Sequence, residues 1–180
     1  MKRTTWAAVF AILVGTGGGS AGPIVEVDLS GVVGDGADRD TVRVGEEIAV
    51  DLWFVGGEPL VAWGITLCSP GGALEFVDAA YRMPGAWTNE TPESRSPGCV
   101  YLGAANRFFG PLAPPFLAVT VTYRAAGEAL AELVVDEQNS GWFARSFVTG
   151  TVDGSIGASV AIAPPLPPAS TWGTVKGLFR

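Results

Sequence analysis

Apolar and polar residues alternate with a period of two along most of this chain. Residues 25–29 read VEVDL and residues 48–54 read IAVDLWF, with every second side chain apolar. Successive side chains of a β-strand point to opposite faces of a sheet, so each segment has one face to bury. No segment of helix length between residues 23 and 162 has the 3.6-residue period of an amphipathic helix. The sequence therefore predicts a domain built from strands.

Turn signals rich in glycine, such as those at residues 34–36 and 70–72, separate the candidate strands. Many strands with one apolar face are buried when two sheets pack face to face. We therefore predict an all-β fold, an antiparallel β-sandwich of jelly-roll or immunoglobulin-like type with about nine strands, and residues 82–97 as the longest irregular segment. The other candidate strands lie at residues 41–44, 61–67, 73–80, 98–105, 117–124, 129–135, 143–152 and 155–162.

The N-terminus has the three-part pattern of a secretory signal peptide. Lys2 and Arg3 precede an apolar run at residues 6–14, and Gly19 and Ala21 suit the −3 and −1 positions of a cleavage site. The apolar run is too short to span a bilayer, which needs about 20 residues. We predict a signal peptide over residues 1–22, cut near Ala21, and a secreted or cell-surface protein without a transmembrane segment. The alternative is a buried N-terminal helix.

The C-terminus predicts two appendages after a domain at residues 23–162. Residues 163–168 read APPLPP and predict a semi-rigid, proline-rich linker. Residues 169–180 form a short tail in which Trp172, Val175 and Phe179 would share one side of a helix. Such a tail suits sorting or attachment of an exported protein. The alternative is a tail that packs on its own domain or frays.

Composition excludes several function classes. The chain has 180 residues, no histidine, 11 Lys and Arg against 18 Asp and Glu, and a formal net charge of −7. Without histidine, Ser-His-Asp and Cys-His catalysis and histidine-containing zinc sites are excluded. The acidic balance argues against nucleic acid as a partner, because phosphate binding needs a positive footprint. We predict a protein that is not an enzyme and holds no cofactor.

The chain has two cysteines, Cys68 and Cys99, each at the end of a candidate strand. In an exported chain this pattern predicts a disulfide bond, which would hold residues 82–97 against the sandwich. The alternative is a pair of buried thiols.

Five segments together resemble the cohesin domain. They are 42–50 (VRVGEEIAV), 64–67 (GITL), 74–79 (LEFVDA), 117–123 (LAVTVTY) and 154–156 (GSI). Cohesins are β-sandwich modules that bind dockerins in cellulosomes and also occur alone in exported bacterial and archaeal proteins. The resemblance implies a sandwich fold and a binding role in an extracellular assembly.

Three tryptophans and one amide are candidate ligand-binding residues: Trp53, Trp87, Trp142 and Asn139. Exposed aromatic rings beside polar groups stack on sugar rings. The alternative is that the tryptophans belong to the core or cover a sheet edge.

Three carboxylates lie in the segment from Asp35 to Asp40, which also contains Gly36. Oxygen ligands suit calcium, so Asp35, Asp38 and Asp40 are candidate Ca²⁺ ligands, although their spacing differs from that of an EF-hand. The alternative is a solvated acidic turn.

The sequence therefore predicts an exported, non-catalytic module that binds a protein partner or a polysaccharide in an extracellular assembly. The first alternative is a structural or surface-attached module without a specific ligand. The second is a glycoside hydrolase or other hydrolase, because paired carboxylates cannot be recognised from spacing alone.

Overall fold

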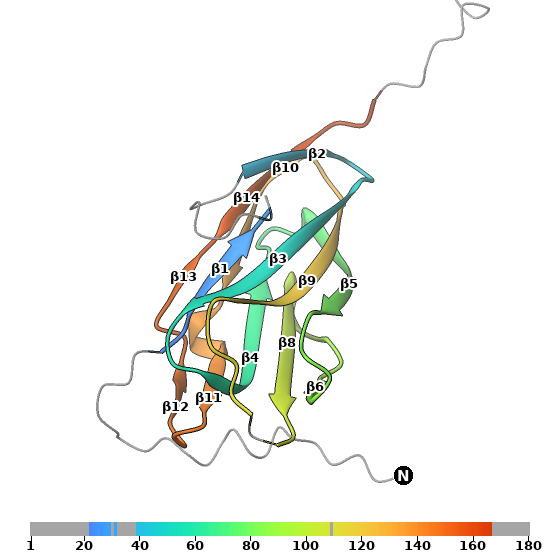
Figure 1. The fold of residues 1–180 in the computed structure, drawn as a ribbon. Coiled ribbons are helices and arrows are strands. Elements are labelled where there is room, and N and C mark those ends of the chain that lie inside the picture. The colour runs from blue at the N-terminus through green and yellow to red at the C-terminus, as the bar shows by residue number, and fades with distance from the viewer. Residues whose placement is uncertain (1–21, 30, 32–38, 109, 167–180) are drawn as a thin grey trace, which may run out of the picture.

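The computed structural model describes residues 22–29, 31, 39–108 and 110–166. These residues form two packed β-sheets with fourteen strands (Figure 1). Their only helical element is a short 3-10 turn, η2 (Glu137–Asn139). Within the described residues, no helix is long and apolar enough to cross a membrane. The predicted signal peptide up to Ala21, Asp35, Asp38 and the tail at 169–180 lie outside the described residues.

Five strands form the first layer, hereafter sheet 1. They are β1 (Ile24–Asp28), β3 (Glu47–Gly56), β5 (Leu74–Tyr81), β9 (Phe116–Ala125) and β13 (Gly154–Ile156). Their order across the sheet is β13-β1-β3-β9-β5, so β5 is an edge strand.

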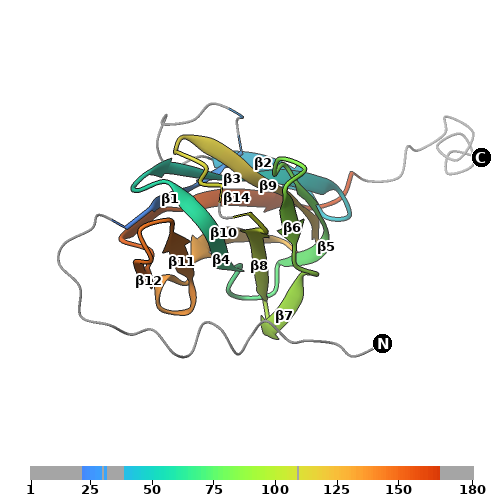
Figure 2. The same cartoon turned by 60° about the horizontal axis from the view of Figure 1, so that its bottom comes forward.

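Nine strands form the second layer, hereafter sheet 2. They are β2 (Arg39–Arg43), β4 (Leu60–Cys68), β6 (Trp87–Asn89), β7 (Glu93–Ser96), β8 (Cys99–Asn106), β10 (Ala129–Val135), β11 (Gly141–Ala144), β12 (Thr149–Thr151) and β14 (Ala158–Ala163). The main path runs β12-β11-β4-β10-β14-β2, with β8 along the other edge of β4 and with β6 and β7 beside β8 (Figure 2). Strands β10 and β11 share one edge of β4, and η2 joins them.

The prediction of an all-β sandwich is confirmed, but two of its details are wrong. The sheets are mixed, because β1 pairs with β13 and β14 pairs with β2 in parallel. The strand number exceeds the predicted count because residues 143–152 and 155–162 fall in two strands each, and because residues 82–97 contain β6 and β7. The exposed sequence ESRS of β7 has no apolar alternation that would have revealed a strand.

The predicted alternation places the core between the sheets. In β3, Ile48, Val50, Leu52 and Phe54 are buried, while the residues between them face outward. The ring of Phe54 stacks on Phe116 of sheet 1 at 5.0 Å and tilts against Trp63 of sheet 2 at 5.6 Å. Burial of each large apolar side chain contributes about 1.5 to 3 kcal/mol, so these contacts hold the two layers together.

Candidate functional site

The outer surface of β11, β4 and β8 consists mainly of small, uncharged residues. Trp63, Ile65 and Leu67 of β4 point into the core, so the residues between them point outward. None of the outward positions on these three strands carries Asp, Glu, Lys or Arg. We call this surface the glycine face; its residues are Ala62, Gly64, Thr66, Cys68, Cys99, Tyr101, Gly103, Ala105, Gly141 and Phe143.

Three glycines lie in register across the middle of the glycine face. Gly141 of β11 pairs with Gly64 of β4, and Gly64 pairs with Gly103 of β8. The ring of Tyr101 lies over the strip that these glycines leave open: a Cβ atom at Gly64 would come within 2.9 Å of Tyr101 Cε2. A Cβ atom at Gly103 would come within 2.9 Å of Glu90 Oε2. A side chain at Gly64 would displace the Tyr101 ring, whereas one at Gly103 would displace only the end of the Glu90 side chain.

Tyr101 is the half-buried aromatic residue at the centre of this face. Its hydroxyl is hydrogen-bonded to Glu90, and the guanidinium carbon of Arg95 lies 4.4 Å from its ring centroid. Burial and the neighbouring Glu90 carboxylate raise the pKa of Tyr101 to about 12. The phenol is thus neutral at physiological pH, and the ring lies between the Arg95 guanidinium and the Glu90 carboxylate at the centre of the face.

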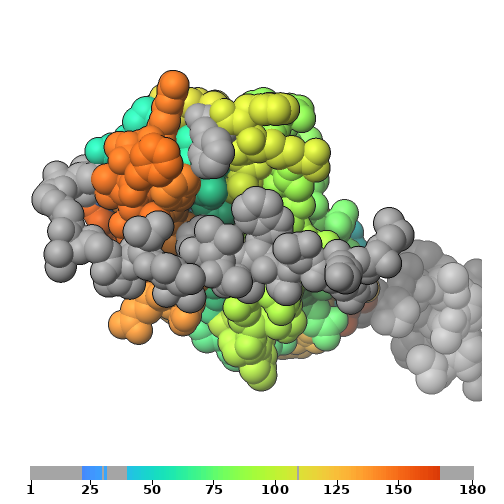
Figure 3. Space-filling model, turned by 90° about the horizontal axis from the view of Figure 1, so that it is seen from below, coloured from blue at the N-terminus to red at the C-terminus, as the bar shows by residue number. Residues whose placement is uncertain are grey.

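A second aromatic group lies at the β11 margin. Phe143 meets Phe147 of the β11–β12 turn edge to face, with ring centroids 5.9 Å apart. Phe147 is 75% exposed and has a φ of 64°, which is uncommon for a bulky residue. Phe108, in the segment after β8, is 81% exposed. Figure 3 looks onto the end of the molecule that carries both segments, the β11–β12 turn in orange and the segment after β8 in yellow.

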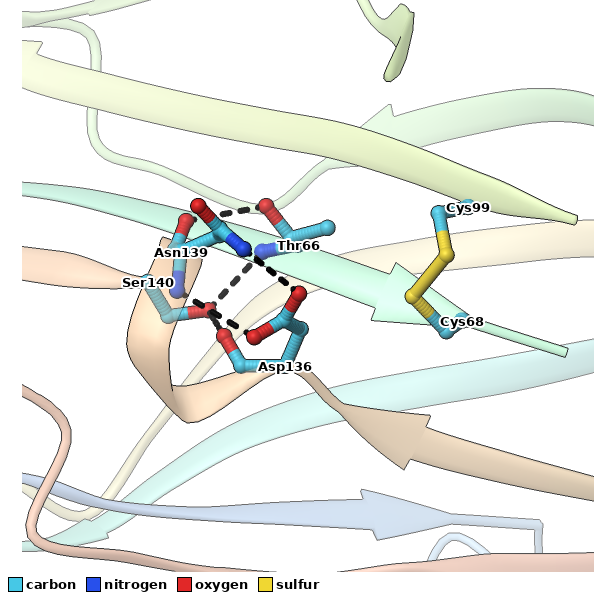
Figure 4. The surroundings of a disulfide bond; sticks show 6 residues. All are labelled: Thr66, Cys68, Cys99, Asp136, Asn139 and Ser140. Atoms are coloured by element: carbon cyan, nitrogen blue, oxygen red, sulfur yellow. Dashed lines mark hydrogen bonds between the residues drawn. A yellow bond between two sulfur atoms is a disulfide. The ribbon is translucent and has the colours of Figure 1, made fainter. Parts of the chain in front are cut away.

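The turn η2 is fixed to β4 by hydrogen bonds to both backbone and side chain of Thr66 (Figure 4). The Thr66 amide donates to Ser140 Oγ at 3.0 Å, and Thr66 Oγ1 donates to the Asn139 carbonyl at 2.9 Å. The Asp136 carboxylate accepts from the side-chain amide of Asn139 at 2.8 Å. A hollow of about 320 Å³ lies beside this turn, lined by Thr66, Arg95, Ser96, Tyr101, Asp136 and Asn139.

The predicted disulfide bond between Cys68 and Cys99 is present. The two residues are direct partners on β4 and β8, with Cα atoms 4.1 Å apart. The bond joins the end of β4 to the start of β8 at one end of the glycine face (Figure 4).

No family model and no curated protein matches this chain. Among solved structures, the cohesin module of a family 33 glycoside hydrolase from Clostridium perfringens matches with a TM-score of 0.63. The match has 12% identity and covers 81% of this chain and 100% of that chain. The chain has a cohesin-like fold. The resemblance found in the sequence is thus confirmed.

The cohesin-like domain is similar to further modules from other sources. The non-cellulosomal cohesin of the hyperthermophilic archaeon Archaeoglobus fulgidus has a TM-score of 0.59 and 12% identity, covering 79% of this chain and 92% of that one. The sixth cohesin of scaffoldin B from Acetivibrio cellulolyticus, solved in complex with a Cel5 dockerin mutant, has a TM-score of 0.59. It has 10% identity and covers 79% of this chain and 100% of that one. At these identities the similarity concerns the fold.

The cohesin-like domain does not bring the predicted ligand-binding tryptophans together on its surface. Trp87 and Trp142 are 8% and 3% exposed and belong to the core, which favours the alternative given for them. Trp142 Nε1 donates to the Thr151 carbonyl at 2.8 Å. Trp53 is half-buried on sheet 1, and Asn139 lies in η2, between β10 and β11, beside the hollow. These four residues do not form one site.

The predicted calcium ligands are only partly described. Asp40 lies in β2, where its carboxylate accepts from the Thr41 amide at 2.6 Å. Among the described residues, no group of three or more His, Cys, Asp and Glu side chains is placed to hold a metal ion.

The sequence analysis missed the centre of the glycine face, at Gly64, Gly103 and Tyr101. The available signal was a glycine inside an otherwise apolar strand, which often marks a close approach of another group. The signal at Gly64 and Gly103 becomes informative only when the register of β4 and β8 is known.

Proposed function

We propose that this chain is a non-catalytic, exported module that binds a protein partner through the glycine face. The carrying observation is the composition of that face: the outward positions of three adjacent strands are mainly small and uncharged, and the half-buried Tyr101 covers the glycines at their centre. Charged residues are depleted, and tyrosine and phenylalanine enriched, at the centres of protein interfaces. The Tyr101 ring covers Gly64, so a partner would meet the tyrosine at the centre of the face.

The partner class that fits best is a dockerin-type module. The Acetivibrio cellulolyticus cohesin similar to this domain was solved with a dockerin, and the two share a sandwich fold. Tyr101 at the centre and Phe143 at the β11 margin supply the aromatic anchors that a partner would cover. A typical interface covers about 800 Å² on each side, which several strands of one sheet can provide.

Export is supported by two features of the chain. The predicted signal peptide directs it out of the cytosol, and the disulfide bond between Cys68 and Cys99 persists in oxidising compartments. We therefore propose a secreted or cell-surface location. Polysaccharide binding has less support, because Trp87 and Trp142 are committed to the core.

A matched pair of arginine substitutions tests the proposal. Ala62 lies on the glycine face between Phe143 and Ala105, whereas Ala49 lies on the outer surface of sheet 1 opposite Thr122. Both Ala62→Arg and Ala49→Arg add one positive charge at an outward strand position, and each should change stability by less than about 0.5 kcal/mol. Only the first buries an unpaired charge on binding.

The purified chain and both variants are tested by biolayer interferometry against a panel of dockerin modules and a panel of soluble polysaccharides. We expect a dockerin to bind the unchanged chain and Ala49→Arg equally, and Ala62→Arg at least about 30-fold more weakly. Equal loss in both variants, or binding to polysaccharides alone, contradicts the proposal.

A further inference from the structure

The start of the described domain is clasped by an acidic residue from the far end of the sequence. The backbone amide of Gly22 donates to the carboxylate of Asp153, and the amide of Asp153 donates to the carbonyl of Pro23 at 3.1 Å. Asp153 lies where the chain crosses from β12 of sheet 2 to β13 of sheet 1. Gly22 and Pro23 are both buried. The two hydrogen bonds fix the entry to β1 before the strand begins.

The surroundings of Gly22 admit the backbone and nothing larger. A Cβ atom at Gly22 would overlap the Asp153 carboxylate. On the other side, a Cβ atom at Gly57 would come within 2.6 Å of Pro23 Cα, and Gly57 has a φ of 102°. A slot formed by Gly57 and Asp153 therefore receives the dipeptide, with the carboxylate facing the nitrogen of Gly22.

The signal peptide is predicted to be cleaved near Ala21, and cleavage directly after Ala21 would make the Gly22 nitrogen the N-terminus of the mature chain. We propose that the chain is processed after Ala21 and that the slot is the receptor for the new N-terminus. Hydrolysis of the Ala21–Gly22 peptide bond by a signal peptidase adds the hydroxyl of water to the Ala21 carbonyl. The remaining proton of water makes the Gly22 nitrogen an amine. At neutral pH the new Ala21 carboxyl group loses its proton and the amine takes one up, becoming an ammonium group. That ammonium group pairs with the Asp153 carboxylate.

Processing at this position strengthens a contact that is already formed. Before cleavage, Gly22 offers Asp153 a neutral amide hydrogen bond; after cleavage it offers a charge-assisted one, which is shorter and roughly twice as strong. Gly22 is buried but Asp153 is exposed, so salt screens part of this attraction. The salt bridge ties β1 to the crossing between the sheets, so removal of the signal peptide stabilises the mature domain. This inference is independent of the partner bound by the glycine face.

The processing site is tested first. The full chain is exported from a bacterial host, and its N-terminus is determined by intact mass and N-terminal sequencing. We expect Gly22 as the first residue. A mature chain that begins at any other residue overturns the proposed site.

The salt bridge is tested by blocking the ammonium group. A chain released from a fusion carrier with Gly22 first is compared with the same chain acetylated at its N-terminus, which restores a neutral amide. We expect acetylation to lower Tm by about 2 to 4 °C. The difference should disappear in Asp153→Asn and persist in Asp78→Asn, a control at an exposed carboxylate on β5. An equal Tm for free and acetylated chains, or a difference that survives in Asp153→Asn, overturns the salt bridge.

Discussion

On both outer surfaces of the sandwich, the outward residues alternate with buried apolar ones. The outward residues of sheet 1 include charged side chains, whereas those of the glycine face on sheet 2 do not. On sheet 1, the outward residues of β3 and β9 include Glu47, Asp51, Thr122 and Arg124, and Arg124 pairs with Glu47 at 2.6 Å. On sheet 2, the glycine face has no charged residue on its three strands. The inward faces of both sheets are equally apolar.

The two outer surfaces therefore differ in what they offer to a binding partner, although both sheets are stabilised by the same kind of apolar core. The ion pair between Arg124 and Glu47 is about half exposed and contributes at most about 1 kcal/mol, so the outer surface of sheet 1 around this pair is solvated. The strands of the glycine face carry no such pair, and the charges over it, Glu90 and Arg95, reach the Tyr101 ring from β6–β7 residues beside β8. A surface whose own strands carry mainly small, uncharged side chains matches the centre of a protein interface, and this supports the proposed function.

Removing the disulfide bond should cause the largest loss of stability. The bond lies on the glycine face and has no counterpart on sheet 1. A Cys68→Ala/Cys99→Ala variant should lose about 3 to 4 kcal/mol of unfolding free energy, because the bond closes a loop of 31 residues. Urea unfolding of the variant and the unchanged chain measures the loss. A loss below about 1 kcal/mol would mean that strand pairing alone holds the start of β8 against β4.

A smaller effect separates two glycines, one on each sheet. Gly64→Ala puts a methyl group against the Tyr101 ring and should cost about 1 to 3 kcal/mol, whereas Gly56→Ala meets only Ile24 Cδ1, at 3.6 Å. The second change should be neutral or stabilise by about 0.4 to 1 kcal/mol, because alanine restricts the unfolded chain. Thermal unfolding of both variants tests the pair. Equal costs would show that Tyr101 moves aside freely and that the glycine strip has no special role.

The sequence predicted those parts of the fold that depend on a buried face. Strands β3, β4 and β9 were found because their apolar alternation is complete. Strand β7 was missed because all four of its residues are exposed, and pairing with β8 alone makes it a strand. The parallel pairs β1–β13 and β14–β2 were missed because alternation defines a face but no direction.

The candidate site was harder to predict, because it depends on register between distant segments. Gly64, Gly103 and Gly141 are far apart in the sequence and become neighbours only through the pairing of β4 with β8 and β11. The tryptophans were conspicuous in the sequence, but Trp142 also satisfies an alternating core position and is buried for that reason. The disulfide bond was predictable because both cysteines end strands.

The smallest expected effect concerns the pKa of Tyr101 on sheet 2, compared with the pKa values of Tyr81 and Tyr123 on sheet 1. Burial is the main cause that raises the pKa of all three tyrosines, Tyr81, Tyr101 and Tyr123, above 10.0, and for Tyr101 to about 12. Unfolded tyrosines ionise near pH 10, so the folded state holds the neutral phenols more strongly. Their contribution to stability is therefore present below pH 10 and is lost as the pH rises from about 10 to about 12.

Absorbance at 295 nm during an alkaline titration measures this directly. We expect the tyrosines of the folded chain to ionise above the pH at which unfolded tyrosines do, and the ionisation near pH 12 to disappear in Tyr101→Phe. In Gly64→Ala the displaced ring should ionise closer to pH 10, because its burial against β4 and its contact with Glu90 are lost. The contrary result is an ionisation near pH 10 in the unchanged chain that is absent from Tyr101→Phe. Such a result would show that the Tyr101 ring lies in solvent and does not cover the glycine strip.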